Sequence, residues 1–186
     1  MSRNAQPDFS LTDLKRARAI GTIYSDGPTI VIQEPVLEEI LEFAEHGRSC
    51  EVGGFLLGEV YGDAHSFVVI RQFHPAQKAL STGASLTFTH ETWADLHRRI
   101  CQRHPGEVIL GWQHTHPGLG VFLSGYDLFI QRNFFREPWQ VALVVDPRRQ
   151  ELGFFHWREG EVKDCGFVCA DAGTPARDAG AALQLE

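Results

Sequence analysis

The stretch from residue 107 to residue 127 constrains the fold of this chain more than any other part of the sequence. It contains a short apolar run, Val-Ile-Leu-Gly-Trp, which is followed after one residue by His114-Thr-His116-Pro. A run of this length and composition predicts a buried strand. Ser124 can then cap a helix that we expect to extend to about Arg136. The sequence therefore predicts a strand, a loop and a helix, with polar side chains gathered where the three meet.

The other segments alternate between helix-like and strand-like patterns. Apolar residues recur at helical spacing after Pro35, and Gly47 closes that pattern, whereas 141–145 is an uninterrupted apolar run typical of a fully buried strand. This mixture predicts an α/β (α+β) fold. We expect strands at 29–33, 50–60, 66–73, 107–113, 141–145, 152–157 and 162–168, helices at 11–19, 35–46, 90–103 and 124–136, and a loop or flexible hairpin at 74–87.

Composition and charge narrow the class of protein. With 186 residues, 43% of them hydrophobic, the chain is long enough for one well-packed core, so we expect a single globular domain. The net charge of −7 and the lack of a basic cluster argue against nucleic-acid binding. No apolar stretch resembles a signal peptide or a membrane span, which predicts a soluble, cytoplasmic protein. The four cysteines are too few for a disulfide framework and are expected to be free thiols without a catalytic role.

The two histidines and the following aspartate can form a metal site. His114 and His116 are two residues apart in an extended segment, so both imidazoles fall on one face. An imidazole nitrogen can bind zinc, and Asp127 on the first turn of the next helix can add a carboxylate oxygen. Three protein ligands leave a fourth coordination position open, which is the mark of a catalytic rather than a structural zinc site.

Each of these residues also has a simpler interpretation. Ser124 and Asp127 have the spacing of a capping box, in which they only satisfy backbone donors at a helix start. An isolated His-x-His pair is more often surface or core histidine, and an isolated Glu51 is usually a solvated strand end. The metal interpretation is favoured because all of these residues fall at strand-to-helix junctions of one compact domain, among glycines that allow close backbone approach.

The same residues resemble the fingerprint of the JAMM metallopeptidases, also called MPN+ domains. That fingerprint is a Glu on an early strand, followed by His-x-His-Pro, six residues and Ser-x-x-Asp, and every position is filled here, with Glu51 as the glutamate. The resemblance covers roughly residues 28–168. It implies an MPN/JAB fold, a cytidine-deaminase-like three-layer arrangement with a curved mixed β-sheet flanked by helices. The catalytic domain would be 28–168, between an N-terminal arm (1–27) and a flexible C-terminal tail (169–186).

The resemblance also implies a role for each fingerprint residue. His114, His116 and Asp127 are expected to hold one zinc ion per chain. Glu51 is expected to orient and deprotonate the zinc-bound water and to return the proton to the departing amine. The Ser124 hydroxyl is expected to donate a hydrogen bond to the oxyanion that develops on the scissile carbonyl.

The activity that this resemblance implies is that of a zinc-dependent isopeptidase or deubiquitinase-like protease. It would cleave after the C-terminal tail of a ubiquitin-like protein, in deconjugation or precursor processing. A stand-alone domain is most similar to bacterial members encoded beside ubiquitin-like conjugation enzymes, so activating and conjugating enzymes of the same operon are candidate partners. Segment 74–87 corresponds in position to the first insertion of the family, which can pair with the substrate's tail or remain a plain loop.

Three alternatives remain beside this interpretation. The substrate can instead be a sulfur-carrier protein or a small peptide-like conjugate. A non-catalytic MPN scaffold is disfavoured because such proteins have lost metal ligands, whereas none is lost here. A phage-tail peptidase relative would carry a second, cysteine-peptidase domain, for which this chain has no room.

Overall fold

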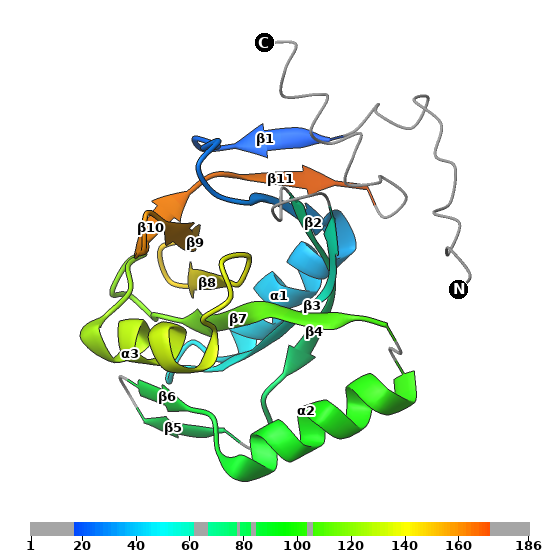
Figure 1. The fold of residues 1–186 in the computed structure, drawn as a ribbon. Coiled ribbons are helices and arrows are strands. Elements are labelled where there is room, and N and C mark those ends of the chain that lie inside the picture. The colour runs from blue at the N-terminus through cyan, green and yellow to red at the C-terminus, as the bar shows by residue number, and fades with distance from the viewer. Residues whose placement is uncertain (1–16, 62–66, 78, 83–84, 104–105, 172–186) are drawn as a thin grey trace, which may run out of the picture.

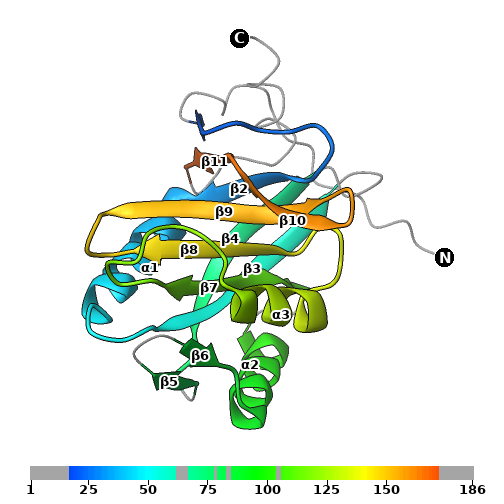
Figure 2. The same ribbon diagram turned by 90° about the vertical axis from the view of Figure 1, so that its left-hand side faces the viewer.

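A mixed nine-stranded β-sheet forms the centre of the protein, and helices cover both of its faces (Figure 1). The computed structural model describes residues 17–61, 67–77, 79–82, 85–103 and 106–171. One face packs against α1 (Glu34–His46). The other face packs against α2 (His90–Arg103) and α3 (Gly125–Phe134), and the sheet curls between the two layers (Figure 2). The predicted arrangement of a curved mixed sheet flanked by helices is confirmed.

The order of strands in the sheet differs from their order in the chain. The strands run β1 (Arg18–Ile20), β11 (Phe167–Ala170), β2 (Thr29–Gln33), β4 (Phe67–Pro75), β3 (Gly53–Tyr61), β7 (Val108–Thr115), β8 (Val141–Asp146), β9 (Glu151–Arg158) and β10 (Glu161–Cys165). Three neighbouring pairs are parallel, namely β11–β2, β2–β4 and β7–β8. A separate hairpin consists of β5 (Leu80–Thr82) and β6 (Ser85–Thr87). None of the helices in the described ranges is long and apolar enough to span a membrane.

The two faces of the sheet bury separate sets of apolar side chains. Alternation along β7 and β8 sends Leu143 and Val145 toward α1, and Trp112 and Val144 toward α2 and α3. Gly111 allows β7 and β8 to approach closely, because a Cβ at this position would lie 1.9 Å from the carbonyl oxygen of Val141. The strand that leads to the two histidines is therefore held in the middle of the sheet.

Most of the predicted elements are present, with shifted ends. Helix α2 has the bounds predicted from the sequence, and α1 and α3 begin and end within two residues of theirs. The predicted strand at 162–168 is wrong, because the chain breaks at Gly166 into β10 and β11. The backbone of Gly166 lies against Ile20 and Gly21, where a Cβ would meet the Ile20 carbonyl at 2.6 Å. The chain leaves β9 at this point and continues between β1 and β2.

The predictions for the two ends of the chain can be compared with the structure only where residues are described. Residues 1–16 and 172–186 lie outside the described residues, and so does most of the helix predicted at 11–19. Its last part is wrong, because Arg18 to Ile20 form a strand that pairs with β11. Cys169 and Ala170, which we had assigned to the tail, belong to β11. Cys50, Cys165 and Cys169 are free thiols, as expected.

A buried histidine on β9 makes the stability of this fold depend on pH. Only 1% of His156 is exposed, and its ring lies against Gly27, where a Cβ would come within 2.3 Å of Cε1. Burial, assisted by the positive charge of Arg158, lowers the pKa of His156 to about 4. In the unfolded chain the same imidazole takes up a proton near its ordinary pKa of about 6.5.

We therefore expect acid to destabilise the protein through His156. Between pH 6.5 and pH 4 the unfolded chain binds the extra proton, so the free energy of unfolding falls as the pH is lowered through this window. The loss between pH 7.5 and pH 5 should be about 2 kcal/mol. Urea denaturation of wild type and His156→Leu at both pH values measures it. The variant should lack this part of the pH dependence, and equal pH dependence in the two proteins would contradict the assignment.

Candidate metal centre

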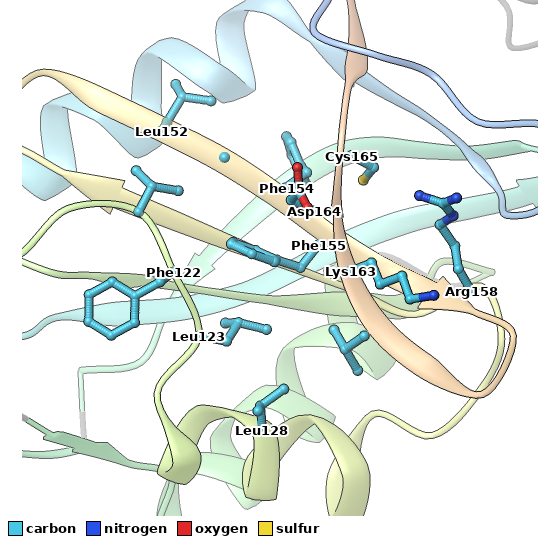
Figure 3. Close-up of a pocket in the computed structure, with 13 residues that line it drawn as sticks. Phe122, Leu123, Leu128, Leu152, Phe154, Phe155, Arg158, Lys163, Asp164 and Cys165 are labelled. Carbon is cyan, nitrogen blue, oxygen red and sulfur yellow. The ribbon is translucent and has the colours of Figure 1, made fainter.

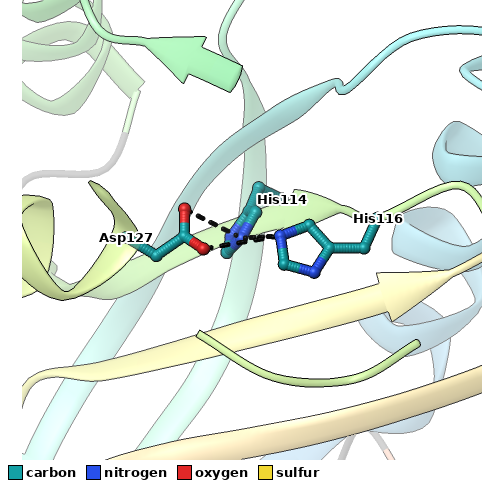
Figure 4. Close-up of side chains that lie close together, drawn as sticks. All are labelled: His114, His116 and Asp127. Carbon is teal, nitrogen blue, oxygen red and sulfur yellow. Dashed lines mark hydrogen bonds and ion pairs between the residues drawn. The ribbon is translucent and has the colours of Figure 1, made fainter. Parts of the chain in front are cut away.

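Three buried side chains converge where β7 ends and α3 begins (Figure 4). The Nε2 atoms of His114 and His116 are 3.1 Å apart. The Asp127 carboxylate reaches both rings, with Oδ1 3.4 Å from Nε2 of His114 and Oδ2 3.4 Å from Nε2 of His116. All three residues are at least 95% buried. The structure thus brings together the three metal ligands predicted from the sequence.

Strand pairing places the two histidines. His114 lies opposite Gly53 of β3 on one side and Val144 of β8 on the other. His116 follows the last residue of β7, and its backbone N–H still donates to the carbonyl of Val145. Because the backbone remains extended through both residues, their side chains leave on the same face, toward α3.

The start of α3 places Asp127. Ser124 is the N-cap, its Oγ accepts the N–H of Asp127, and its own N–H donates to Asp127 Oδ2 at 2.6 Å. This is the capping box that the spacing allowed. Oδ1 takes no part in the box and points at His114. Capping and metal binding are therefore compatible, since the carboxylate has two oxygens and the box uses one.

The donor set fits a tetrahedral divalent cation. Ligand atoms 2.0–2.1 Å from a tetrahedral zinc ion lie roughly 3.3 Å from one another. The two Nε2 atoms are 3.1 Å apart, and each lies 3.4 Å from one oxygen of Asp127, Oδ1 for His114 and Oδ2 for His116, so each pair is close to that value. Two imidazoles and a carboxylate are also the ligand chemistry found in catalytic zinc sites. His114, His116 and Asp127 can together hold a metal ion.

Burial and mutual attraction set the charges in the cluster. Burial alone would raise the pKa of Asp127, but hydrogen bonds to His114 and His116 hold it well below its ordinary range. Burial lowers the pKa of the His114 imidazole, which therefore favours its neutral form. An ionised carboxylate and a neutral imidazole are the protonation states that bind metal.

Glu51 lies beside His116. Its Oε1 is 3.9 Å from Nε2 of His116, and 3% of the residue is exposed. Glu51 was predicted to lie on a strand, but β3 begins two residues later, at Gly53. The neighbouring Val52 forms two hydrogen bonds with Thr115 of β7, one to its hydroxyl oxygen and one from its backbone N–H. Burial, with a contribution from the nearby Asp127 charge, raises the pKa of Glu51. A carboxyl with a raised pKa next to the ligands is suited to receive and return a proton.

Trp112, at the end of the apolar run, and Gln131, which was not predicted from the sequence, support the cluster. The indole of Trp112 stacks on the His114 ring with 4.4 Å between centroids and 10° between planes. Its Nε1–H donates to Gln131 Oε1 at 2.7 Å, and Gln131 donates in turn to the carbonyls of Phe135 and Gln140. Gln131 lies one helical turn after Asp127 on the buried stripe of α3. This spacing of four residues from Asp127 is the one feature of the sequence that could have indicated a supporting role for Gln131.

A pocket of about 680 Å³ opens next to the cluster (Figure 3). The aromatic ring of Phe122 lines it and also packs on His116, with 4.7 Å between ring centroids. Leu123 and Leu128 line the pocket on the α3 side, and the β9–β10 hairpin forms the opposite wall. The proposed ligands and Glu51 are not among the residues that line this pocket, so Phe122 is its link to the cluster.

Comparison with known families agrees with this geometry. The model of the JAB1/Mov34/MPN/PAD-1 ubiquitin protease family matches residues 25–137, which include Glu51 and the whole cluster. The chain belongs to this family. Within it, the chain is 32% identical over 123 residues to COP9 signalosome complex subunit 5 of Caenorhabditis elegans, covering 64% of this chain and 33% of that protein.

Of two further relatives of this JAB-family chain, one is named as a proteasome subunit and the other as a ubiquitin hydrolase. It is 34% identical over 137 residues to 26S proteasome non-ATPase regulatory subunit 14 of Drosophila melanogaster, covering 69% of this chain and 44% of the relative. It is 31% identical over 127 residues to ubiquitin carboxyl-terminal hydrolase RPN11 of Saccharomyces cerevisiae. This match covers 67% of this chain and 40% of the relative. The chain thus spans less than half the length of these relatives.

The fold has also been seen in a solved structure. The solution structure of a protein from Desulfitobacterium hafniense matches with a TM-score of 0.60 and 20% identity, covering 77% of this chain and 94% of the other. At this level of identity the match concerns the fold alone.

Zinc binding is the first prediction from this geometry. Wild-type protein dialysed against zinc should retain one ion per chain, because three ligand atoms are already at coordination spacing. Removing one ligand in His116→Ala should leave only a small fraction of that zinc, whereas the exposed His97→Ala on α2 should bind like wild type. Elemental analysis of the three proteins measures this. Equal zinc in wild type and His116→Ala would contradict the predicted site.

The second prediction concerns Gln131. Gln131→Leu removes the acceptor of the Trp112 indole N–H and loosens the ring on which His114 stacks. Zinc affinity should fall by roughly 10- to 100-fold, the usual effect of losing a partner that orients a ligand. Competition with a chelator measures the affinity. Asn133→Leu, at an exposed position of the same helix, is the control and should not weaken binding.

Proposed function

We propose that this protein is a zinc-dependent isopeptidase that cleaves after the C-terminal tail of a ubiquitin-like protein. The observation that carries the proposal is the placement of Glu51 within 3.9 Å of a buried His114–His116–Asp127 cluster in a chain of this family. A cluster that only bound metal for stability would need no carboxylic acid of raised pKa beside an open coordination position.

In the proposed reaction the zinc ion, its three ligands, Glu51 and Ser124 each have a separate task. When bound, zinc would polarise the scissile carbonyl and lower the pKa of water at the open position. His114, His116 and Asp127 would hold it. Glu51 accepts the proton of the attacking water and passes it to the departing amine. The Ser124 Oγ accepts the Asp127 N–H, and its hydroxyl donates a hydrogen bond to the developing oxyanion.

The hairpin next to the site offers a place for an extended tail. Leu86 of β6 is buried and lies directly over Gly53, whose Cβ would meet its side chain at 2.5 Å. Thr87 Oγ1 is 2.9 Å from the Tyr126 hydroxyl at the start of α3. A flexible C-terminal segment that added to this hairpin as a strand would lead its last peptide bond to Glu51 and the metal ligands. Such a mode selects an unstructured tail rather than a folded surface.

The biological setting belongs to the same proposal. Relatives named as ubiquitin hydrolase or proteasome subunits support a ubiquitin-like substrate. We propose residues 28–168 as the catalytic domain, and we propose that it acts in the bacterial cytoplasm with activating and conjugating enzymes of its own operon. A sulfur-carrier protein is the alternative substrate, and an assay with fusions of both kinds separates the two.

Replacing Glu51 tests the proposed mechanism. Glu51→Gln keeps the size of the side chain but cannot take up a proton, so cleavage of a ubiquitin-like fusion should fall by at least about 100-fold. Zinc content and thermal stability should stay at the wild-type values, because Glu51 is not a proposed ligand. Glu38→Gln, exposed on α1, is the matched control and should be fully active. Retention of activity in Glu51→Gln with zinc bound would contradict the proposal.

A further inference from the structure

The loop that joins the metal ligands to Ser124 is fastened to the sheet by one buried carboxylate. Residues 117–123 connect His116 to the N-cap of α3 without a helix or strand of their own. Asp146, the last residue of β8, is fully buried beneath this loop. Its Oδ1 accepts the N–H of Gly118 and its Oδ2 accepts the N–H of Gly120, both at 2.8 Å.

The loop has a backbone that suits this role. Gly118 and Gly120 have φ values of +82° and +91°, in the region that favours glycine. This conformation turns two N–H groups toward the same carboxylate. An ionised carboxylate that accepts several backbone donors holds them more strongly than a neutral acceptor does.

The same carboxylate also fixes the turn that follows β8. Oδ1 accepts the N–H groups of Arg148 and Arg149 at 3.0 and 3.2 Å. The guanidinium of Arg148 then donates twice to the carbonyl of Arg48, three residues before Glu51, at 2.9 and 3.1 Å. Asp146 thus stands between the segment that carries Glu51 and the loop that ends at Ser124.

We infer that Asp146 is a positioning residue, which sets the path of loop 117–123 and so the place of the Ser124 hydroxyl at the reacting carbonyl. The inference rests on the proposed function, and it adds a residue outside the fingerprint to the machinery. Asp146 touches none of the ligand side chains in the described contacts. Its effect on Ser124 passes through Gly120, while β7 and the first turn of α3 hold His114 and Asp127. The loop also meets the cluster through Phe122, whose ring packs on His116.

A double-mutant cycle separates positioning from general support of the fold. In Asp146→Asn the single amide oxygen can serve the three donors at Oδ1, and the amide NH₂ then faces the N–H of Gly120, which loses its acceptor. We expect kcat to fall roughly 10- to 100-fold with KM nearly unchanged, since small displacements of positioned groups have effects of this size. Zinc content should stay at the wild-type value.

Non-additivity with Ser124→Ala is the decisive readout. If Asp146 acts through Ser124, adding Asp146→Asn to Ser124→Ala should lower kcat by less than about threefold more. Multiplication of the two single effects would overturn the inference, as would loss of zinc in parallel with kcat. Asp95→Asn, which removes ion pairs with Arg98 and Arg99 on α2, is the control for the chemical change and should leave kcat unchanged.

Two further measurements keep the inference testable if a variant is unstable or the substrate is wrong. Gly120→Ala disturbs the loop from the donor side while Asp146 stays, and it should show the same loss of kcat and the same non-additivity.

Amide hydrogen exchange needs no substrate. In Asp146→Asn the Gly120 amide should exchange at least about tenfold faster, while those of Gly118 and Val144 are nearly unchanged. Uniform acceleration across the sheet would show a purely structural role, whereas an inactive wild type would count only against the proposed function.

Discussion

The attraction between one buried carboxylate and two buried imidazoles is the interaction on which the rest of the site depends. An ionised Asp127 with about 5% of its surface exposed would be costly without a positive or hydrogen-bonding partner. Both rings and the first turn of α3 supply such partners. The parallel pairing of β7 with β8 and the capped start of α3 are what keep these groups within 3.4 Å of one another.

Asp127 belongs both to the capping box of α3 and to the candidate metal site. Capping fixes the side chain of Asp127 by binding Oδ2, which leaves Oδ1 directed at His114. The same box holds Ser124 at the end of the loop. A helix start is a precise place to mount these side chains because the backbone donors there need acceptors in any case.

The sequence predicted the parts of this protein that depend on local patterns. Helix α2 and the three proposed ligands could be predicted, because apolar periodicity and the spacing of the polar residues can be recognised in a short stretch of sequence. The break at Gly166 could not, because it depends on contact with Ile20 and Gly21, which are distant in the chain. Gln131 was missed for the same reason, since its role requires knowing that α3 crosses Trp112. Asp146 was missed as well, because only the fold shows which backbone donors its carboxylate accepts.

The ligands and Glu51 come from separate parts of the chain. One strand, one loop and one helix turn supply His114, His116 and Asp127, whereas Glu51 arrives from a segment before β3. In the proposed mechanism, metal binding and proton transfer therefore depend on separate segments of the chain. A descendant that exchanged Glu51 alone would keep the proposed ligands and the fold, and selection could retain it as an inactive partner of an active copy.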